Sequence, residues 1–450
     1  KKFRVQVIKN LNCNEGINSS ISLGIKKLPR NSLSTMICLA DMPLLKSENY
    51  NLVDSIEDSD SVIINTCGFL DLAREESVDT ILECAEYRKT GKIQKLIVMG
   101  CFSERYGDDL QNEIPEVDKF FGTADHAEIL TYLTGKDFKR DDPNYFRSLL
   151  TPKHYAYLKI AEGCDNVCSF CSIPMMRGLQ KSSTLEQNLI EAQMLADRGV
   201  KELLIIAQDT TSYGWDLNPK SSLHELCDVL NNVKGLEWIR LHYAHPAHLH
   251  KEMIKKFGQL EKLIPYVDMP TQHGSDSILK NMKRGLNCEG IKKRISQLRE
   301  VNDKISIRTS IIVGFPNETE QDFKDLYKYI EEVKFDRLGV FKYSEEEGTS
   351  AAIDYKDNIP TEVKQNRYDE IMMLQQQINL NKNLDRVGNE EKVIVDVVSD
   401  EGWSLARSYR DAPEIDNYVK INKKLIKGNF YNVKIKEAYE YDVLGDLIEK

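Results

Sequence analysis

The sequence EGCDNVCSFC, residues 162–171, places Cys164, Cys168 and Cys171 in the spacing C-x3-C-x2-C. It follows the apolar, β-rich run Tyr155–Ile160, so we expect the three cysteines on a loop at the carboxyl end of a strand, where α/β folds place their chemistry. A structural zinc site needs a fourth ligand, and no second cysteine pair lies nearby. Three thiolates on one loop instead suit a [4Fe–4S] cluster that keeps one iron open for a small molecule.

Strands and helices alternate around this loop over residues 153–385, which we take as one domain. Six strands that alternate with helices predict a parallel sheet or a partial (β/α)6 barrel. The expected strands are Tyr155–Ile160, Glu202–Ala207, Trp238–His242, Tyr266–Met269, Ser306–Val313 and Leu338–Phe341. The expected helices are Thr184–Arg198, Ser222–Asn232, His248–Phe257, Cys288–Glu300, Thr319–Val333 and a final helix from Glu362 to about Leu384.

Two smaller domains flank this one. Residues 1–140 contain short apolar runs around a helical stretch and predict an α/β unit with a parallel sheet. Residues 141–152 hold two prolines and no periodicity, which is typical of a linker. Residues 386–450 contain short strands separated by polar turns and predict a small β-barrel. The expected strands are Arg4–Ile8, Ser61–Ile64 and Lys95–Val98 in the first domain, with the helix Leu72–Arg88, and Lys392–Val398, Asn417–Ile421, Tyr431–Lys436 and Tyr441–Leu444 in the last.

The composition is that of a globular protein and restricts its partners. The chain has 450 residues, of which 41% are hydrophobic, and a formal net charge of −10. That charge does not fit a protein that holds nucleic acid chiefly by neutralising phosphates, so we expect no DNA partner. No apolar run approaches the ~20 residues of a membrane span, and the first ten residues do not read as a signal peptide. We expect a cytoplasmic protein, whose ten cysteines serve metal or redox chemistry rather than disulfides.

At the Cys164–Cys171 loop the sequence resembles the radical S-adenosylmethionine (SAM) superfamily. The resemblance implies that the open iron binds SAM and that one electron from the cluster cleaves SAM to methionine and a 5′-deoxyadenosyl radical. It also implies that three segments at later strand ends line the SAM pocket, where glycine allows a close backbone approach. The pocket residues that the resemblance implies are Phe170, Gln208, Asp209, Gln272, His273, Ser275, Val313 and Gly314.

Two further cysteines occupy equivalent positions in residues 1–140. Cys67 and Cys101 each follow a predicted strand, and residues at the same offset after parallel strands can converge at one edge of a sheet. A second cluster with an open iron needs a third thiol. Cys13 follows the first predicted strand at a looser offset and is our first choice, with Cys38 as the alternative.

This arrangement resembles the methylthiotransferases, a subgroup of radical-SAM enzymes. The resemblance covers nearly the whole chain and implies an amino-terminal domain with a second [4Fe–4S] cluster, the radical-SAM domain and a carboxy-terminal TRAM β-barrel. It implies that this second cluster, held by Cys13, Cys67 and Cys101, presents sulfur to the substrate radical. The sequence departs from the family around Cys13, where it reads LNCNE instead of the usual Gly-Cys-x-Lys-Asn, and residues 26–48 look like an insertion.

The substrate depends on the type within the family. Some members modify an adenosine of tRNA, whereas the RimO type modifies the β-carbon of an aspartate in a small-subunit ribosomal protein, number twelve in that series. Asp209 stands where the tRNA enzymes usually have Asn, and residues 386–450 carry 11 basic and 13 acidic residues. A slightly acidic barrel suits a basic ribosomal protein better than tRNA. We therefore expect the RimO type, which uses two clusters, two SAM molecules and a reductant such as flavodoxin or ferredoxin.

Two other interpretations stay open. One is a tRNA adenosine methylthiotransferase, with the same domains and clusters. The other belongs to a different class, a non-catalytic, metal-stabilised adaptor that docks on the ribosome. The adaptor predicts zinc or no metal and no SAM cleavage.

Overall fold

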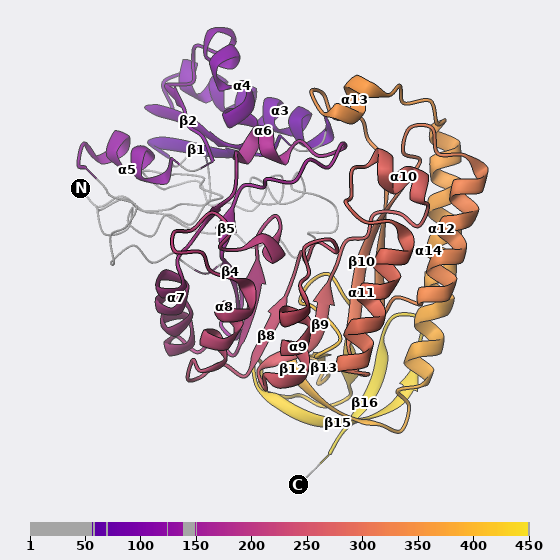
Figure 1. Cartoon of the computed structure of the whole chain (residues 1–450). Helices are drawn as coiled ribbons and strands as arrows, with labels where there is room; N and C mark the ends of the chain where they lie inside the picture. Colours follow the sequence, from indigo (N-terminus) through magenta and orange to yellow (C-terminus); the bar gives the residue numbers. More distant parts are fainter. Residues whose placement is uncertain are drawn as a thin grey trace. The chain divides into compact units, whose positions relative to one another are not determined.

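The computed structural model describes residues 56, 59–68, 71–123, 125–137, 149 and 151–448 (Figure 1). The predicted strand Arg4–Ile8, Cys13, Cys38, the 26–48 insertion and nearly all of the 141–152 linker lie outside the described residues. The chain divides into two compact units, one of residues 1–150 with Ser172–Gly178, the other of Thr151–Cys171 with Leu179–Lys450.

The first unit contains the predicted parallel sheet. Its described strands are β1 (Ser61–Thr66), β2 (Lys95–Gly100) and β3 (Lys119–Phe120), in the order β1-β2-β3, with both pairs parallel. Because helices cover such a sheet, its strands are continuous apolar runs, and Val62, Ile64 and Leu96 are buried in the core. Its helices are α3 (Asp71–Lys89), α4 (Cys101–Glu113), α5 (His126–Thr134) and the short α6 (Ile173–Arg177).

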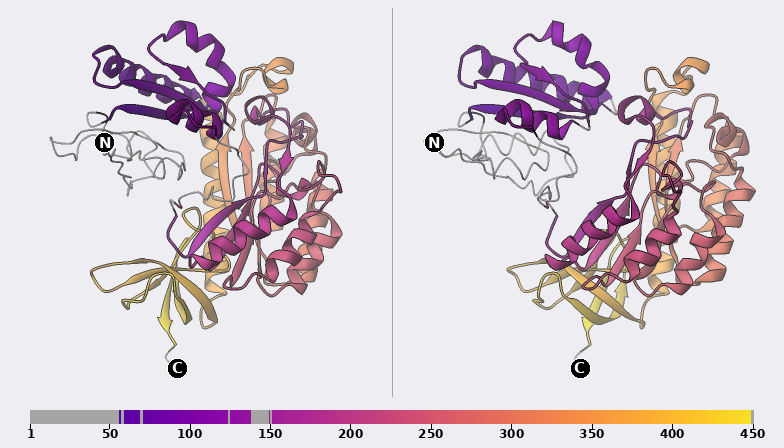
Figure 2. Two further views of the ribbon diagram at one scale, coloured as in Figure 1. Left: turned by 90° about the vertical axis from the view of Figure 1, so that its left-hand side faces the viewer. Right: turned by 60° about the vertical axis from the view of Figure 1, so that its left-hand side comes forward.

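A six-stranded parallel sheet forms the centre of the second unit. Its order is β11-β10-β9-β8-β7-β4, so strands that are consecutive in the chain are neighbours in space. The first and last strands are not paired with each other, and the sheet is an open, partial barrel with helices on its outer face (Figure 2). The strands are β4 (Tyr155–Lys159), β7 (Glu202–Ile206), β8 (Trp238–Leu241), β9 (Leu263–Asp268), β10 (Ser306–Val313) and β11 (Arg337–Lys342).

The connecting helices begin at local sequence signals. Thr184 and Gln187 form a capping box at the start of α7, and Thr319 and Asp322 form one at α12. The helices are α7 (Leu185–Asp197), α8 (Leu223–Asn231), α9 (Lys251–Gln259), α10 (Asp276–Asn281), α11 (Cys288–Val301), α12 (Glu320–Val333), α13 (Ser350–Asp354) and α14 (Thr361–Leu384). A hairpin of β5 (Ala161–Glu162) and β6 (Lys181–Ser182) and the single turn η3 (Thr210–Ser212) complete the domain.

The carboxy-terminal residues form a closed five-stranded barrel, as predicted. Its order is β12-β13-β14-β16-β15, and apolar side chains such as Val393, Ala406 and Val433 fill its interior. One strand, β13, was missing from the sequence prediction. The strands are β12 (Glu390–Val398), β13 (Ser404–Ser408), β14 (Val419–Ile421), β15 (Phe430–Ala438) and β16 (Val443–Leu447).

The barrel packs against the amino-terminal end of the parallel sheet (Figure 1). Trp238, the first residue of β8, stacks edge-on against Phe430 of β15, with ring centroids 4.8 Å apart. Arg407 of β13 is fully buried and binds Glu202, the first residue of β7. Because the barrel covers the amino-terminal end of the sheet, we expect the active site at the opposite, carboxyl end. Among the described residues, no helix combines the length and the apolar character that a membrane span requires.

Candidate active site

The three cysteines of the central motif lie together on the loop that follows β4 and β5 at the carboxyl end of the sheet. None of them forms a disulfide. Cys164 is buried, and burial raises the pKa of its thiol. The backbone N–H of Cys171 donates to the carbonyl oxygen of Cys168 over 3.1 Å, which closes the loop into a tight turn.

A buried guanidinium lies against this loop. Arg284, which follows α10, donates from Nη1 to Sγ of Cys168 over 3.1 Å and from Nη2 to the Pro270 carbonyl over 2.7 Å. Its buried Nε has no partner. Three cysteines outside any disulfide, with a cation beside them, fit an iron–sulfur cluster, because hydrogen bonds to the sulfurs stabilise its negative charge. Sequence reasoning missed Arg284, since a lysine–arginine–glycine turn carries no specific signal.

Asp209 follows β7 and is almost completely buried. Its carboxylate accepts hydrogen bonds from the backbone and hydroxyl of Thr211, from Nδ2 of Asn166 over 2.9 Å and from Nδ1 of His248 over 2.8 Å. Burial raises the pKa of this carboxyl, but the bonds from His248, Thr211 and Asn166 outweigh burial and hold the pKa well below its usual range. Asp209 is therefore an ionised group whose oxygens are directed at its own protein.

The side-chain oxygen of the neighbouring Gln208 has no hydrogen-bond partner. Gln208 donates from Nε2 to Oε1 of Glu162 over 2.8 Å, while its Oε1 is buried without a hydrogen-bond partner. Glu162 also accepts from Lys159 of β4 over 2.6 Å. A buried, unpartnered acceptor is costly unless a ligand donates to it, so Gln208 fits a pocket role.

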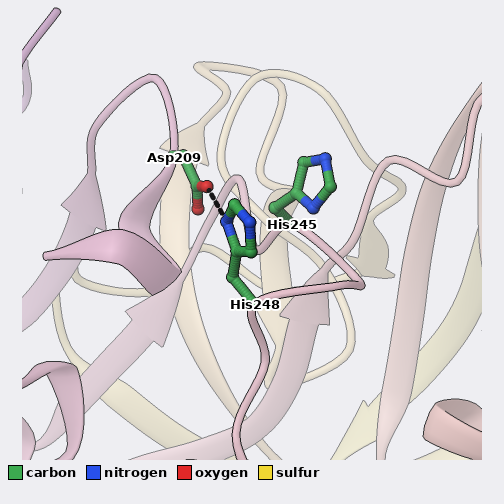
Figure 3. A group of neighbouring side chains, drawn as sticks. All are labelled: Asp209, His245 and His248. Carbon is green, nitrogen blue, oxygen red and sulfur yellow. Dashed lines mark hydrogen bonds and ion pairs between the residues drawn. The ribbon is translucent and has the colours of Figure 1, made fainter. Parts of the chain in front are cut away.

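A pair of histidines lies beside Asp209, on the loop after β8. In Figure 3 the ring of His248 lies between Asp209 and His245. The two imidazole rings are stacked, with centroids 4.6 Å apart. Burial lowers the pKa of His245 to about 3, so this ring is neutral at physiological pH.

Sequence reasoning missed this pair. It predicted that the helix begins at His248, but α9 begins at Lys251, so His248 lies on a strand-end loop. A usable signal was present, because the stretch HYAHPAHLH, residues 242–250, contains four histidines directly after a strand.

The segment after β9 is held by its own backbone and by the next helices. Gln272 has φ +73° and continues the pairing with β10, donating from N to the Ser310 carbonyl over 2.9 Å. His273 is fully buried, and its Nδ1 accepts from the Ser275 amide over 2.9 Å. Ser275 donates to Asp322 over 2.5 Å and begins α10. The side chain of Ser275 therefore serves the loop itself, whereas Nε2 of His273 is buried without a hydrogen-bond partner, 3.5 Å from Oε2 of Glu318.

The segment after β10 is a tight turn around Gly314. Val313 is fully buried, and the Gly314 amide donates to Oε2 of Glu318 over 2.7 Å. Gly314 has φ +72°, a left-handed backbone that favours glycine. Phe170 of the cysteine loop packs with Phe315 in one apolar cluster. The predicted pocket residues thus lie on segments at one edge of the sheet, while their contacts with SAM stay predictions.

In the first unit, Cys67 and Cys101 follow residues that are direct partners in the parallel sheet. Thr66 pairs with Gly100, so each cysteine is the first residue beyond the paired strands. The ends of β1 and β2 approach each other closely, because a Cβ added to Gly100 would lie 2.4 Å from the Thr66 carbonyl oxygen. The structure therefore brings these two cysteines to one sheet edge, as predicted from their offsets, while Cys13 and Cys38, the two candidates for a third ligand, lie outside the described residues.

Cys84, Cys227 and Cys288 lie on helices, as the sequence predicts. Burial raises the pKa of the Cys84 and Cys227 thiols to about 12, which makes them poor metal ligands.

Three family models match the chain, each over one of its parts. Residues 158–330 match the radical SAM superfamily, residues 387–448 the TRAM domain and residues 38–122 an uncharacterised family designated UPF0004. A protein from Flavobacterium psychrophilum is 46% identical over 408 residues, which cover 90% of this chain and 93% of that protein. A protein from Thermoanaerobacter sp. is 43% identical over 439 residues, which cover 95% and 98%. Both are named ribosomal protein uS12 methylthiotransferase RimO.

The chain belongs to the RimO family. A solved structure supports the fold independently: the radical SAM methyltransferase TsrM from Kitasatospora setae has a TM-score of 0.51 and 12% identity, and the match covers 72% of this chain and 78% of that one. As in other radical SAM proteins, the family implies a [4Fe–4S] cluster and SAM. The three cysteines of the Cys164–Cys171 loop, none of them in a disulfide, fit such a cluster.

Proposed function

We propose that this RimO-family enzyme replaces a C–H bond by C–S–CH3 at the β-carbon of an aspartate in small-subunit ribosomal protein uS12. The observation that carries the proposal is that the chain has two sets of cysteines, each of which follows the carboxyl ends of parallel strands. One set is the three cysteines after β4, which form no disulfide, and the other contains Cys67 and Cys101 after β1 and β2. A single radical cluster would account for the first set only.

We assign a separate role to each proposed domain. Residues 1–140 form the methylthiotransferase domain, 141–152 the linker, 153–385 the radical-SAM domain and 386–450 the TRAM barrel. The family matches over 38–122, 158–330 and 387–448 support these ranges.

In the radical-SAM domain, Cys164, Cys168 and Cys171 hold the cluster. A cluster and SAM bound there would supply the radical chemistry needed to activate a C–H bond of the substrate. Arg284 orients Cys168 and offsets negative charge at its sulfur. Gln208 offers its buried oxygen to a donor on the ligand.

In the amino-terminal domain, Cys67, Cys101 and Cys13 hold a second cluster, with Cys38 as the alternative third ligand. When bound there, this cluster supplies the sulfur that the product retains. Cys101 is the first residue of α4, at the end of the helix where its dipole favours negatively charged groups. We place the reaction in the cytoplasm, with a flavodoxin or ferredoxin as the reductant.

A product assay tests the proposal. The protein is reconstituted anaerobically with iron and sulfide and given SAM and a strong reductant. One sample receives a peptide that copies the aspartate loop of uS12, and the other receives tRNA with the prenylated adenosine. We expect mass spectrometry to find an added methylthio group on the peptide only. Modified tRNA would overturn the substrate, and no SAM cleavage with zinc in place of iron would favour an adaptor.

Iron analysis tests the ligands separately. We expect about eight iron atoms per chain, from two four-iron clusters, and about four after Cys164, Cys168 and Cys171 are all changed to alanine. Cys288→Ala, on helix α11, is the matched control and should keep about eight. A triple variant that retains all its iron would disprove the assignment.

A single variant tests the third ligand. Cys13→Ala should abolish methylthiolation while SAM cleavage persists. An unchanged product yield would move the ligand role to Cys38 or to another residue.

A further inference from the structure

We propose that His248, oriented by Asp209, binds the side-chain carboxylate of the aspartate that is modified. The proposal rests on the proposed function and adds to it a residue that recognises the target side chain. No role for His248 or His245 follows from the motifs described above, because both lie on the loop after β8, outside the motif segments.

The first observation is the way Asp209 holds His248. Nδ1 of the imidazole lies 2.8 Å from Oδ2 of Asp209, and the carboxylate is itself fixed by Thr211 and Asn166. A carboxylate that accepts from Nδ1 fixes the tautomer and the orientation of a histidine, and leaves Nε2 for a ligand. About a quarter of the His248 side chain is exposed, so a ligand can reach the ring.

The second observation is the tautomer of His245. Its Nδ1 accepts a hydrogen bond from the Ala247 amide over 3.2 Å. A neutral imidazole that accepts at Nδ1 carries its proton on Nε2, so His245 offers an N–H donor. Among the described residues, neither ring makes a hydrogen bond through Nε2. The two stacked rings thus carry polar atoms that the surrounding protein does not satisfy.

The site adjoins the cysteine loop. Asn166, which binds Asp209, lies between Cys164 and Cys168 in the sequence. Trp215, 43% exposed, packs against His248 with ring centroids 4.9 Å apart. An orienting carboxylate, an imidazole and an exposed aromatic ring therefore lie together beside the loop that carries Cys164 and Cys168.

The chemistry of the ligand follows from the donors. His248 is held to Asp209 through Nδ1, so binding of a ligand carboxylate requires a proton on Nε2 as well. Such charge-assisted hydrogen bonds are about twice as strong as neutral ones, so an aspartate is favoured over an asparagine of the same shape. The side chain that reacts would then be held by the group next to its β-carbon.

A metal ion is the competing ligand for this cluster. Asp209, His245 and His248 each offer a ligand atom, all within 4.8 Å of one another. However, four hydrogen bonds already satisfy the Asp209 carboxylate, and the Ala247 amide occupies Nδ1 of His245. This pattern favours a site that donates to an anion over a site that surrounds a cation.

The experiment compares two peptides on the reconstituted enzyme with SAM. Binding is measured anaerobically for the uS12 loop peptide with aspartate and for the same peptide with asparagine at the target position. The test variant is His248→Asn, whose amide can still donate to Asp209 but lacks an atom at the Nε2 position. The control is His250→Asn, the residue before α9, which also lies near Trp215, at 6.0 Å, but makes no bond to Asp209.

We expect the wild-type enzyme and His250→Asn to prefer the aspartate peptide by about tenfold to a hundredfold. His248→Asn should bind both peptides equally, while it keeps its iron and still cleaves SAM. Preserved discrimination in His248→Asn would overturn the inference, as would one zinc per chain that this variant loses. A wild-type enzyme that modifies neither peptide would instead contradict the proposed function.

Discussion

At the scale of single residues, Gly314 is the position in the candidate site where the backbone angle and the neighbouring side chain most strongly require glycine. Its φ is +72°, and an added Cβ would lie 2.3 Å from Cγ of Lys364. Lys364 cannot move away easily, because its buried Nζ binds the Tyr343 carbonyl and Asp357. Gly314→Ala should therefore lower the free energy of unfolding by about 2–3 kcal/mol, measured by urea denaturation of the full chain.

A variant of Gly402 measures the cost of backbone strain without a steric collision. This glycine has φ +93°, but an added Cβ would meet nothing within 4 Å. Gly402→Ala should cost only the left-handed strain, about 1 kcal/mol. Equal losses in the two variants would show that Lys364 gives way and that Gly314 is required for its φ alone.

How much of the site the sequence predicts also depends on single residues. Cysteine spacing is a strong signal, because few chemistries need three thiols on one loop, and the Cys164–Cys171 loop lies where it was predicted. Arg284 and His248 carry no such signal, since arginine and histidine are common on surfaces. Their roles depend on contacts with residues more than 30 positions away, Cys168 and Asp209, which no local pattern contains.

At the scale of elements, Asp322 joins two helices. It caps α12 together with Thr319, and it accepts from Ser275 and Ser277 at the start of α10. Burial raises the pKa of Asp322, but the hydrogen bonds from Ser275, Ser277 and Thr319 outweigh it and lower the pKa from 3.8 to about 2. Since the folded value is depressed, the stabilisation is complete above pH ~4 and is lost as the pH falls towards 2.

Asp322→Asn tests this link. At neutral pH the variant should be less stable by about 2 kcal/mol, and the difference from wild type should shrink between pH 4 and pH 2.5. Urea denaturation of the iron-free chains at several pH values gives the comparison. Asp325→Asn, on the exposed face of the same helix, should stay within about 0.5 kcal/mol of wild type throughout. A difference for Asp322→Asn that does not vary with pH would contradict the assignment.

The pattern of apolar residues in the sequence predicted those strands whose position depends only on the burial of apolar side chains. Each of the six strands of the parallel sheet contains several apolar residues, and each was placed within about three residues of its observed ends. Strand β13 was missed because its five residues, SLARS, include only two apolar ones, Leu405 and Ala406. Arg407 is buried there only because Glu202 and Asp396 neutralise it, and Glu202 comes from a different domain.

At the scale of the whole second unit, that arginine ties the carboxy-terminal barrel to the catalytic sheet. Arg407, Glu202 and Arg240 are all fully buried, and Glu202 binds both arginines. His154, just before β4, adds a bond to Asp396 over 2.7 Å. The Glu202–Arg407 and His154–Asp396 pairs join the two domains, so neither pair can form in an isolated domain. The barrel is thus a structural part of the radical-SAM domain as well as a substrate-binding candidate.

Two variants distinguish this buried network from surface attraction between the same two domains. Arg407→Met leaves Glu202 and Asp396 with fewer partners in a buried site and should lower the free energy of unfolding by about 3–5 kcal/mol. Lys392→Met breaks the ion pair with Glu237, whose partners are roughly half exposed, and should cost less than about 1 kcal/mol. Denaturant titrations of both full-length variants measure the difference. If Arg407→Met proved as mild as Lys392→Met, water would have to reach the interface, and the barrel would be a loosely attached module instead of part of the enzyme's core.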